Sequence, residues 1–221
     1  MGLVRTNNGW LAPVEQRALD WLAPRLPRWL TPDRLTGLGF AASIIALVGY
    51  VLSANHPAAL WLVNLALFAN WFGDSLDGKV ARLQRVERPR YGLFLDQSID
   101  ALSQFMFALG LALSGLVRPE IVAFGFGSYL MMTVQGLLRA QTTGVFHLAT
   151  GHIGLTEVRC LFFLANTVLY FLPPWPFQIM RLNLSYADVL GLLWIVANLG
   201  LYVVTMAAEL KKLRTGEDGD K

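Results

Sequence analysis

Six apolar runs alternate with short polar segments along most of the chain. Each run is close to the roughly 20 residues that a helix needs to cross a bilayer. Helices are expected because the lipid interior offers backbone polar groups no partner outside the segment itself. The sequence therefore predicts an all-α integral membrane protein with six transmembrane helices, near residues 35–55, 57–77, 93–116, 120–138, 158–174 and 186–208.

A more polar segment precedes the first run, and its apolar positions have helical spacing. Val14, Ala18, Trp21 and Leu22 fall at i, i+4, i+7 and i+8, with charged residues between them. This pattern predicts an amphipathic helix lying in the headgroup region, although a helix packed on its own protein would show the same pattern. Three tryptophans would anchor it at the interface: Trp10, Trp21 and Trp29.

Composition and charge support the membrane assignment. The 221 residues are 55% hydrophobic and 15% charged, below the roughly 25% charged residues of soluble domains. Sixteen of the eighteen Lys and Arg residues lie on the side that holds both termini, and only Arg118 and Arg181 lie opposite. The positive-inside rule then predicts cytoplasmic termini. The expected layout is an interfacial segment over 1–34, a transmembrane domain over 35–210 and a polar cytoplasmic tail over 211–221, with membrane lipids and no nucleic acid as partners.

Four aspartates lie where the second and third predicted spans meet the cytoplasmic side. Asp74 and Asp77 are three residues apart, and Asp96 and Asp100 are four apart, so each pair shares a helix face. The short loop between the spans makes them antiparallel neighbours. We therefore expect all four carboxylates to lie at one depth and to point into one space.

Clustered carboxylates repel one another, and a divalent cation removes that repulsion. Carboxylate oxygens suit Mg²⁺, Mn²⁺ or Ca²⁺, and Mg²⁺ often joins carboxylates to substrate phosphates. Two such ions can clamp a displacement at phosphorus. Five basic residues that could contact phosphate surround the cluster: Lys79, Arg82, Arg85, Arg88 and Arg90.

Intramembrane aspartates also occur in ion and proton transporters, which form the rival class. A transporter would place its carboxylates near the bilayer midplane, beside broken helices. Here the acids lie near one surface and beside a basic cluster. The sequence therefore favours metal-dependent chemistry on a phosphate ester.

The spacing around the aspartates resembles the signature of the CDP-alcohol phosphatidyltransferase family. The pattern D-x-x-D-G-x-x-A-R, nine residues, then G-x-x-x-D-x-x-x-D runs from Asp74 to Asp100. The family pattern more often has eight residues between its halves. The resemblance covers residues 31–210, closely at the signature and by hydropathy elsewhere. Eight positions at fixed spacing make it a specific signal.

The resemblance implies an enzyme of phospholipid biosynthesis. Such enzymes use two Mg²⁺ or Mn²⁺ ions to displace CMP from a CDP-linked alcohol by an acceptor hydroxyl, and they form homodimers. By position, Asp74, Asp77, Asp96 and Asp100 would hold metal, and Asp100 would be the catalytic base. The nucleotide would be bound by Asp74, Gly78, Ala81, Arg82 and Gly92.

The acceptor and the donor stay open at this point. CDP-diacylglycerol and a CDP-amino alcohol are both compatible with the signature. Four further residues on the cytoplasmic side are candidate contacts to the acceptor or to phosphate: Lys79, Arg139, Glu157 and Arg159. A plain connecting loop would account for the last two equally well.

Overall fold

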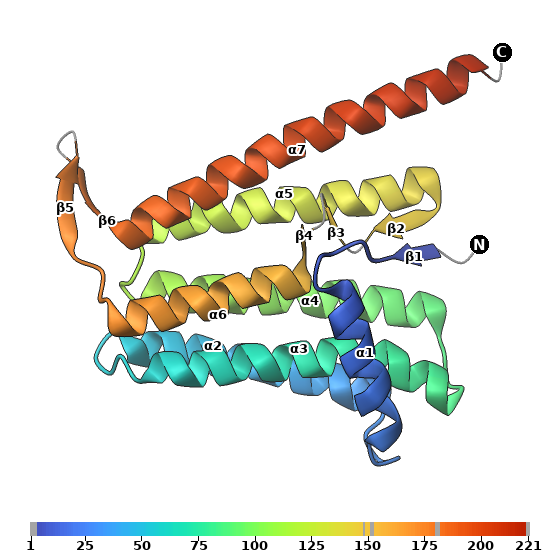
Figure 1. Ribbon diagram of the computed structural model, residues 1–221, viewed down its shortest axis with the longest axis horizontal. Coiled ribbons are helices and arrows are strands. Elements are labelled where there is room, and N and C mark those ends of the chain that lie inside the picture. Colours follow the sequence, from blue (N-terminus) through green and yellow to red (C-terminus); the bar gives the residue numbers. More distant parts are fainter. Residues whose placement is uncertain (1–3, 148, 151–152, 180–181, 220–221) are drawn as a thin grey trace.

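The computed structural model describes the chain except residues 1–3, 148, 151–152, 180–181 and 220–221, and it confirms the all-α prediction (Figure 1). A short helix, α1 (Ala12–Leu22), and a 3-10 turn (Ala23–Arg25) precede six long helices. These are α2 (Pro32–Ser53), α3 (Ala59–Gln84), α4 (Pro89–Leu113), α5 (Pro119–Thr143), α6 (Leu155–Phe171) and α7 (Tyr186–Gly219).

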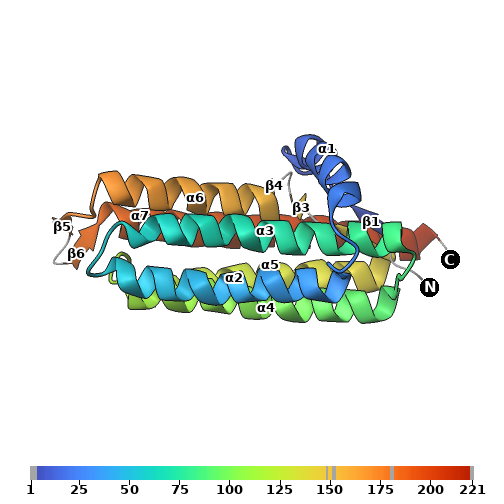
Figure 2. The ribbon, with the colours of Figure 1, turned by 90° about the horizontal axis from the view of Figure 1, so that it is seen from below.

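The long helices run side by side, with the first and last described residues at one end and the β5–β6 hairpin at the other (Figures 1 and 2). Helices α5 and α7 pack together near the hairpin and diverge toward the end that carries the termini. Helix α2 packs against both α3 and α4, and α6 packs against α3.

Within the part of the chain that the structure describes, three of the long helices have both the length and the composition of a membrane span. They are α2, α5 and the part of α7 over Tyr186–Thr215. Helices α3 and α4 carry the aspartates, and α6 has only 17 residues. The count of six transmembrane helices therefore stays a prediction.

Helices α2 and α3 cross at two glycines. A Cβ atom on Gly73 would lie 2.4 Å from the Leu35 carbonyl oxygen and 2.7 Å from the Gly39 nitrogen. Only glycine permits this approach of the two backbones. The crossing lies directly before Asp74, so it sets how close the acidic face of α3 comes to α2.

Buried polar side chains fix α6 against α2 and α3. The Tyr50 hydroxyl donates to Asn166 Oδ1 at 3.0 Å, and Asn166 Nδ2 donates to Asn64 Oδ1 at 3.0 Å. Asn64 Nδ2 in turn donates to Thr167 Oγ1 at 3.2 Å. Because these buried groups have one set of partners, they hold α6 at one register.

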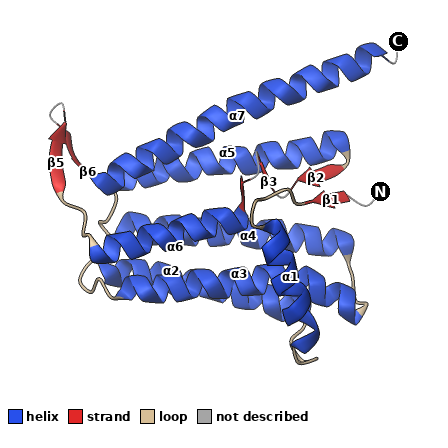
Figure 3. Cartoon of the chain, in the orientation of Figure 1, coloured by secondary structure: helices blue, strands red, loops and turns tan. Residues whose placement is uncertain are grey.

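Among the described residues, six short strands that the sequence did not predict lie in the connections and ahead of α1 (Figure 3). β1 (Val4–Thr6) pairs in parallel with β2 (Val145–His147), and β3 (Ala149–Thr150) pairs with β4 (Ile153–Gly154). β5 (Pro176–Ile179) and β6 (Leu182–Ser185) form the hairpin before α7. The β1–β2 pair joins the start of the chain to the segment after α5.

Candidate active site

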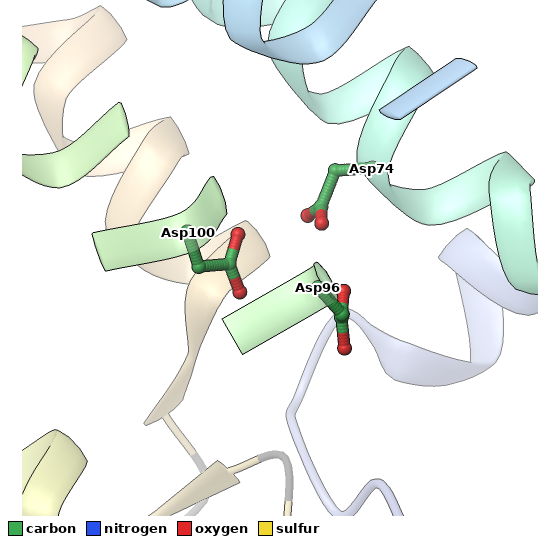
Figure 4. A group of neighbouring side chains, drawn as sticks. All are labelled: Asp74, Asp96 and Asp100. Carbon is green, nitrogen blue, oxygen red and sulfur yellow. The ribbon is translucent and has the colours of Figure 1, made fainter. Parts of the chain in front are cut away.

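Three of the four predicted aspartates converge. One oxygen from each of Asp74, Asp96 and Asp100 lies within 4.8 Å of the others, and the side chains point toward one another (Figure 4). Asp74 comes from α3, and Asp96 and Asp100 come from successive turns of α4. Three carboxylates at this spacing form a donor set that fits a divalent cation such as Mg²⁺ or Mn²⁺.

The fourth aspartate, Asp77, lines the same cavity but makes its own contacts. Its Oδ2 accepts a hydrogen bond of 2.6 Å from the Thr36 hydroxyl on α2. Its Oδ1 accepts from the Gly78 amide. Thr36 thus orients Asp77 from a neighbouring helix, a role that its place in the sequence did not reveal.

Arg159 lies beside the carboxylates. Its Nη2 donates to Asp74 Oδ2 at 2.6 Å, and its Nε donates to Asn70 Oδ1 at 3.1 Å. Asn70 is one turn before Asp74 and also donates to the Gly39 carbonyl. The guanidinium therefore supplies positive charge at the cluster and ties α6 to α3.

A cavity of about 670 Å³ opens above the carboxylates and is bordered by α1 and by α3 to α7. Its lining includes most of the predicted site residues: Asp74, Asp77, Gly78, Lys79, Arg82, Asp96, Asp100, Glu157 and Arg159. Ala81, Gly92 and Arg139 are not among the lining residues. The volume lies within the usual range of small-molecule sites, roughly 300–1,000 Å³.

Arg139 and Glu157 have partners within the protein. The Arg139 Nη2 atom pairs with Glu209 Oε1 at 2.9 Å, between α5 and α7. Glu157 accepts hydrogen bonds from the Leu11 amide at 2.7 Å and the Gly154 amide at 2.9 Å. Glu157 thus caps the start of α6 and holds the segment before α1.

Helix α1 forms one wall of the cavity through Glu15, which the sequence analysis missed. Glu15 Oε1 accepts hydrogen bonds from Trp71 Nε1 at 2.8 Å, Ser75 Oγ at 3.3 Å and Thr156 Oγ1 at 2.6 Å. Lys79 adds an ion pair with Asp20. The sequence places Glu15 on the polar face of an amphipathic helix, where most glutamates face water. It therefore gives no indication that Glu15 fixes α1 against α3 and α6.

Comparisons with known proteins agree on one family. The sequence model described as CDP-alcohol phosphatidyltransferase matches residues 29–206. Cholinephosphotransferase 1 of Homo sapiens is 28% identical over 193 residues, covering 83% of this chain and 47% of the relative. The archaetidylinositol phosphate synthase of Pyrococcus horikoshii is 33% identical, over 62% of this chain and 69% of the relative. That of Methanothermobacter thermautotrophicus is 30% identical, over 74% of this chain and 78% of the relative. The chain thus spans about half the length of the human protein that it matches.

Proposed function

The chain belongs to the CDP-alcohol phosphatidyltransferase family, a membrane-embedded family, and from this premise we propose that it transfers a substituted phosphate group from a CDP-linked alcohol to an acceptor hydroxyl, releasing CMP. The observation that carries the proposal is the convergence of Asp74, Asp96 and Asp100 on one cavity. That cavity also contains Lys79 and Arg82. The reaction belongs to phospholipid biosynthesis.

Asp74, Asp96 and Asp100 would hold Mg²⁺ or Mn²⁺, and Asp77 would complete a site for two ions. When bound, these ions neutralise phosphate charge and polarise the reacting phosphoryl group. The oxygens that lie within 4.8 Å of one another support this assignment.

Asp100 would act as the base. In the step, the acceptor oxygen forms a bond to the β-phosphorus, and its proton passes to Asp100. The bond from the β-phosphorus to the bridging oxygen breaks, and its electron pair leaves with CMP. Asp74, Gly78, Ala81, Arg82 and Gly92 would bind the nucleotide.

Lys79, Arg139, Glu157 and Arg159 would contact the acceptor or its phosphate. Arg159 donates to Asp74 beside the carboxylates, and Lys79 lines the cavity, which supports these two roles. Replacing each residue with Ala and measuring both Michaelis constants tests it. If a variant leaves the Michaelis constants of both substrates unchanged, the replaced residue does not contact the acceptor or its phosphate.

We further propose six membrane spans, an interfacial α1, cytoplasmic termini and a homodimer. The exposed apolar side chains Trp10, Val14, Trp21 and Trp29 suit an interfacial helix. Impermeant maleimide labelling of Arg85→Cys and Asn55→Cys variants, in a Cys160→Ser background and right-side-out vesicles, tests the orientation. Only Asn55→Cys should react. Mass measurement in a detergent of known micelle size tests the dimer.

The rival class is a transporter that uses the aspartates for ions. The family match and the basic residues at the cavity favour the transferase. The test is CMP release by the purified full chain with Mg²⁺ or Mn²⁺, using CDP-diacylglycerol, CDP-choline and CDP-ethanolamine as donors with several acceptors. We expect CMP from at least one donor and a loss of at least about a hundredfold in Asp100→Asn, the range of general base catalysis. Absence of both CMP and CDP binding would contradict the proposal.

A further inference from the structure

A second cavity, of about 560 Å³, lies next to the candidate active site and is lined mainly by apolar side chains. It is lined mainly by α4, α5, α6 and α7, and its lining on α6 extends from Leu155 to Leu169. Fourteen residues of helix separate these positions, which corresponds to about 21 Å. That length exceeds half of the roughly 30 Å hydrocarbon thickness of a bilayer, so a cavity along it could take the chain of a lipid from one leaflet.

Exposed side chains of α6 and α7 border the apolar cavity. Leu161 and Leu164 on α6 border it and are 51% and 59% exposed. Leu190 and Leu193 on α7 also border it and are 53% and 59% exposed. Exposed leucines around an opening at this depth fit a hydrocarbon chain that enters sideways from the membrane.

The two cavities share eight lining residues. Four of these bring a carboxylate, an amide, a phenol and a guanidinium to the boundary: Asp100, Gln104, Tyr129 and Arg159. The other four are Leu155, Val158, Trp194 and Ala197. Asp74, Asp77 and Asp96 line only the polar one. A molecule in the apolar cavity therefore presents its polar end to Asp100, on the side of the site away from Asp77, Gly78 and Arg82.

Two polar atoms lack hydrogen-bond partners at the boundary, on Gln104, and beside it in the apolar cavity, on Ser103. Among the described residues, Gln104 Oε1 and Ser103 Oγ are buried and have no hydrogen-bond partner. Gln104 is one helical turn from Asp100, on the same face of α4. Because buried polar groups without partners are costly, these two fit the hydroxyl and ester groups at the polar end of a lipid.

We infer that the lipid substrate of this protein is the acceptor: a lipid alcohol whose chain fills the apolar cavity and whose hydroxyl lies over Asp100, held by Gln104. This rests on the proposed function, in which Asp100 takes the proton of the acceptor. The CDP-alcohol is then a water-soluble donor in the polar cavity. The lipid oxygen bonds to the β-phosphorus, its proton goes to Asp100, and CMP leaves with the electron pair of the broken P–O bond.

The first test compares donors with the purified full chain in detergent. One reaction contains CDP-choline or CDP-ethanolamine with diacylglycerol, and the other contains CDP-diacylglycerol with serine, inositol phosphate or glycerol phosphate. We expect CMP only from a soluble donor, and only with diacylglycerol present. CMP from CDP-diacylglycerol and a soluble acceptor would overturn the inference and leave the proposed function intact.

Photolabelling tests the cavity without turnover, so it separates this inference from the proposed reaction. A diacylglycerol with a diazirine in one chain should label peptides of α6 and α7, and Ala165→Trp, which fills the cavity, should reduce labelling about tenfold. Ala41→Trp, at an exposed position outside both cavities, should not. Labelling that is equal in both variants, or cross-links that join this face to a second copy, would overturn the inference.

Gln104→Leu gives the kinetic test. Loss of one hydrogen bond to the lipid should raise the KM for diacylglycerol about tenfold and leave the KM for the CDP donor unchanged. Gln141→Leu, the same change at an exposed position outside both cavities, should alter neither constant. A change confined to the KM of the donor would contradict the role given to Gln104.

Discussion

Arg159 shows how single residues assemble this site. Its pair with Asp74 is largely shielded, with 13% and 18% of the two side chains exposed, whereas the Arg88–Asp33 pair is 57% and 48% exposed. We expect Arg159→Ala to lower the free energy of unfolding by about 3 kcal/mol, because Asp74 loses its partner beside two other acids. Arg88→Ala should cost less than about 1 kcal/mol. Thermal unfolding in detergent measures both.

Arg88→Ala is the control for Arg159→Ala, because it removes an exposed ion pair of the same kind. Equal destabilisation by the two substitutions would mean that the Arg159–Asp74 pair is as well solvated as a surface pair. Arg159→Lys should recover part of the stability, since it keeps the charge but cannot also reach Asn70 with a planar fork.

The sequence predicted the positions of the aspartates because their spacing along each helix is fixed. Asp96 and Asp100 are four residues apart and share a helix face, and both converge with Asp74 as predicted. Thr36, Asn70 and Glu15 could not be predicted, because each acts on a residue at least 41 positions away or across a helix crossing. Such contacts depend on tertiary packing, which period and composition do not encode.

At the scale of elements, all six long helices extend beyond their apolar runs at the end that carries the termini. Helix α3 continues to Gln84 past the predicted 77, α5 to Thr143 past 138, and α7 to Gly219 past 208. At the opposite end the helix limits and the runs agree within about three residues. Apolar runs thus predicted the apolar part of each helix, and not the polar turns that build the site. The strands, of two to four residues, were too short for a period-2 pattern to reveal.

The crossing of α2 and α3 allows a direct test of packing. Gly73→Ala places a methyl group against the backbone of α2 and should destabilise the protein by about 1–3 kcal/mol. It should also reduce activity, because Asp74 follows directly. Gly127→Ala on α5 meets no atom within 4 Å and should be neutral or stabilising by up to about 1 kcal/mol. The free energies of unfolding of both variants, measured in the same detergent, test this prediction. An unchanged free energy of unfolding in Gly73→Ala would show that the backbones of α2 and α3 are farther apart than in the structure.

Helix α1 should depend on Glu15 for its position. Glu15→Ala removes the acceptor of three hydrogen bonds, so the amides of residues 12–22 should exchange hydrogen at least about tenfold faster. The KM of the CDP donor should rise, since α1 forms a wall of its cavity. Arg17→Ala is the control, because Arg17 is an exposed residue of the same helix. Exchange that is unchanged in Glu15→Ala would mean that other contacts hold the helix.

At the scale of the whole molecule, the two cavities differ in the polarity of their linings. The polar cavity is lined by the carboxylates and by the basic residues Lys79, Arg82 and Arg159, and the apolar cavity is bordered by exposed leucines of α6 and α7. With the proposed function, the protein would receive one substrate from water and one from lipid without moving either through the other's environment. Asp100, which lines both cavities, would lie where the two substrates meet.

This arrangement predicts that metal and nucleotide bind jointly. CDP alone meets repulsion from three carboxylates, and a divalent cation alone leaves coordination positions unfilled; together each completes the site of the other. Mg²⁺ with CDP should therefore raise the melting temperature by more than the sum of the separate shifts, with up to about 2.7 kcal/mol of stabilisation at a hundred times the dissociation constant. Asp96→Asn should remove the joint effect and leave the protein folded. A site that serves ions alone would respond to Mg²⁺ in the same way with and without CDP, so strictly additive shifts would favour the transporter and count against the transferase.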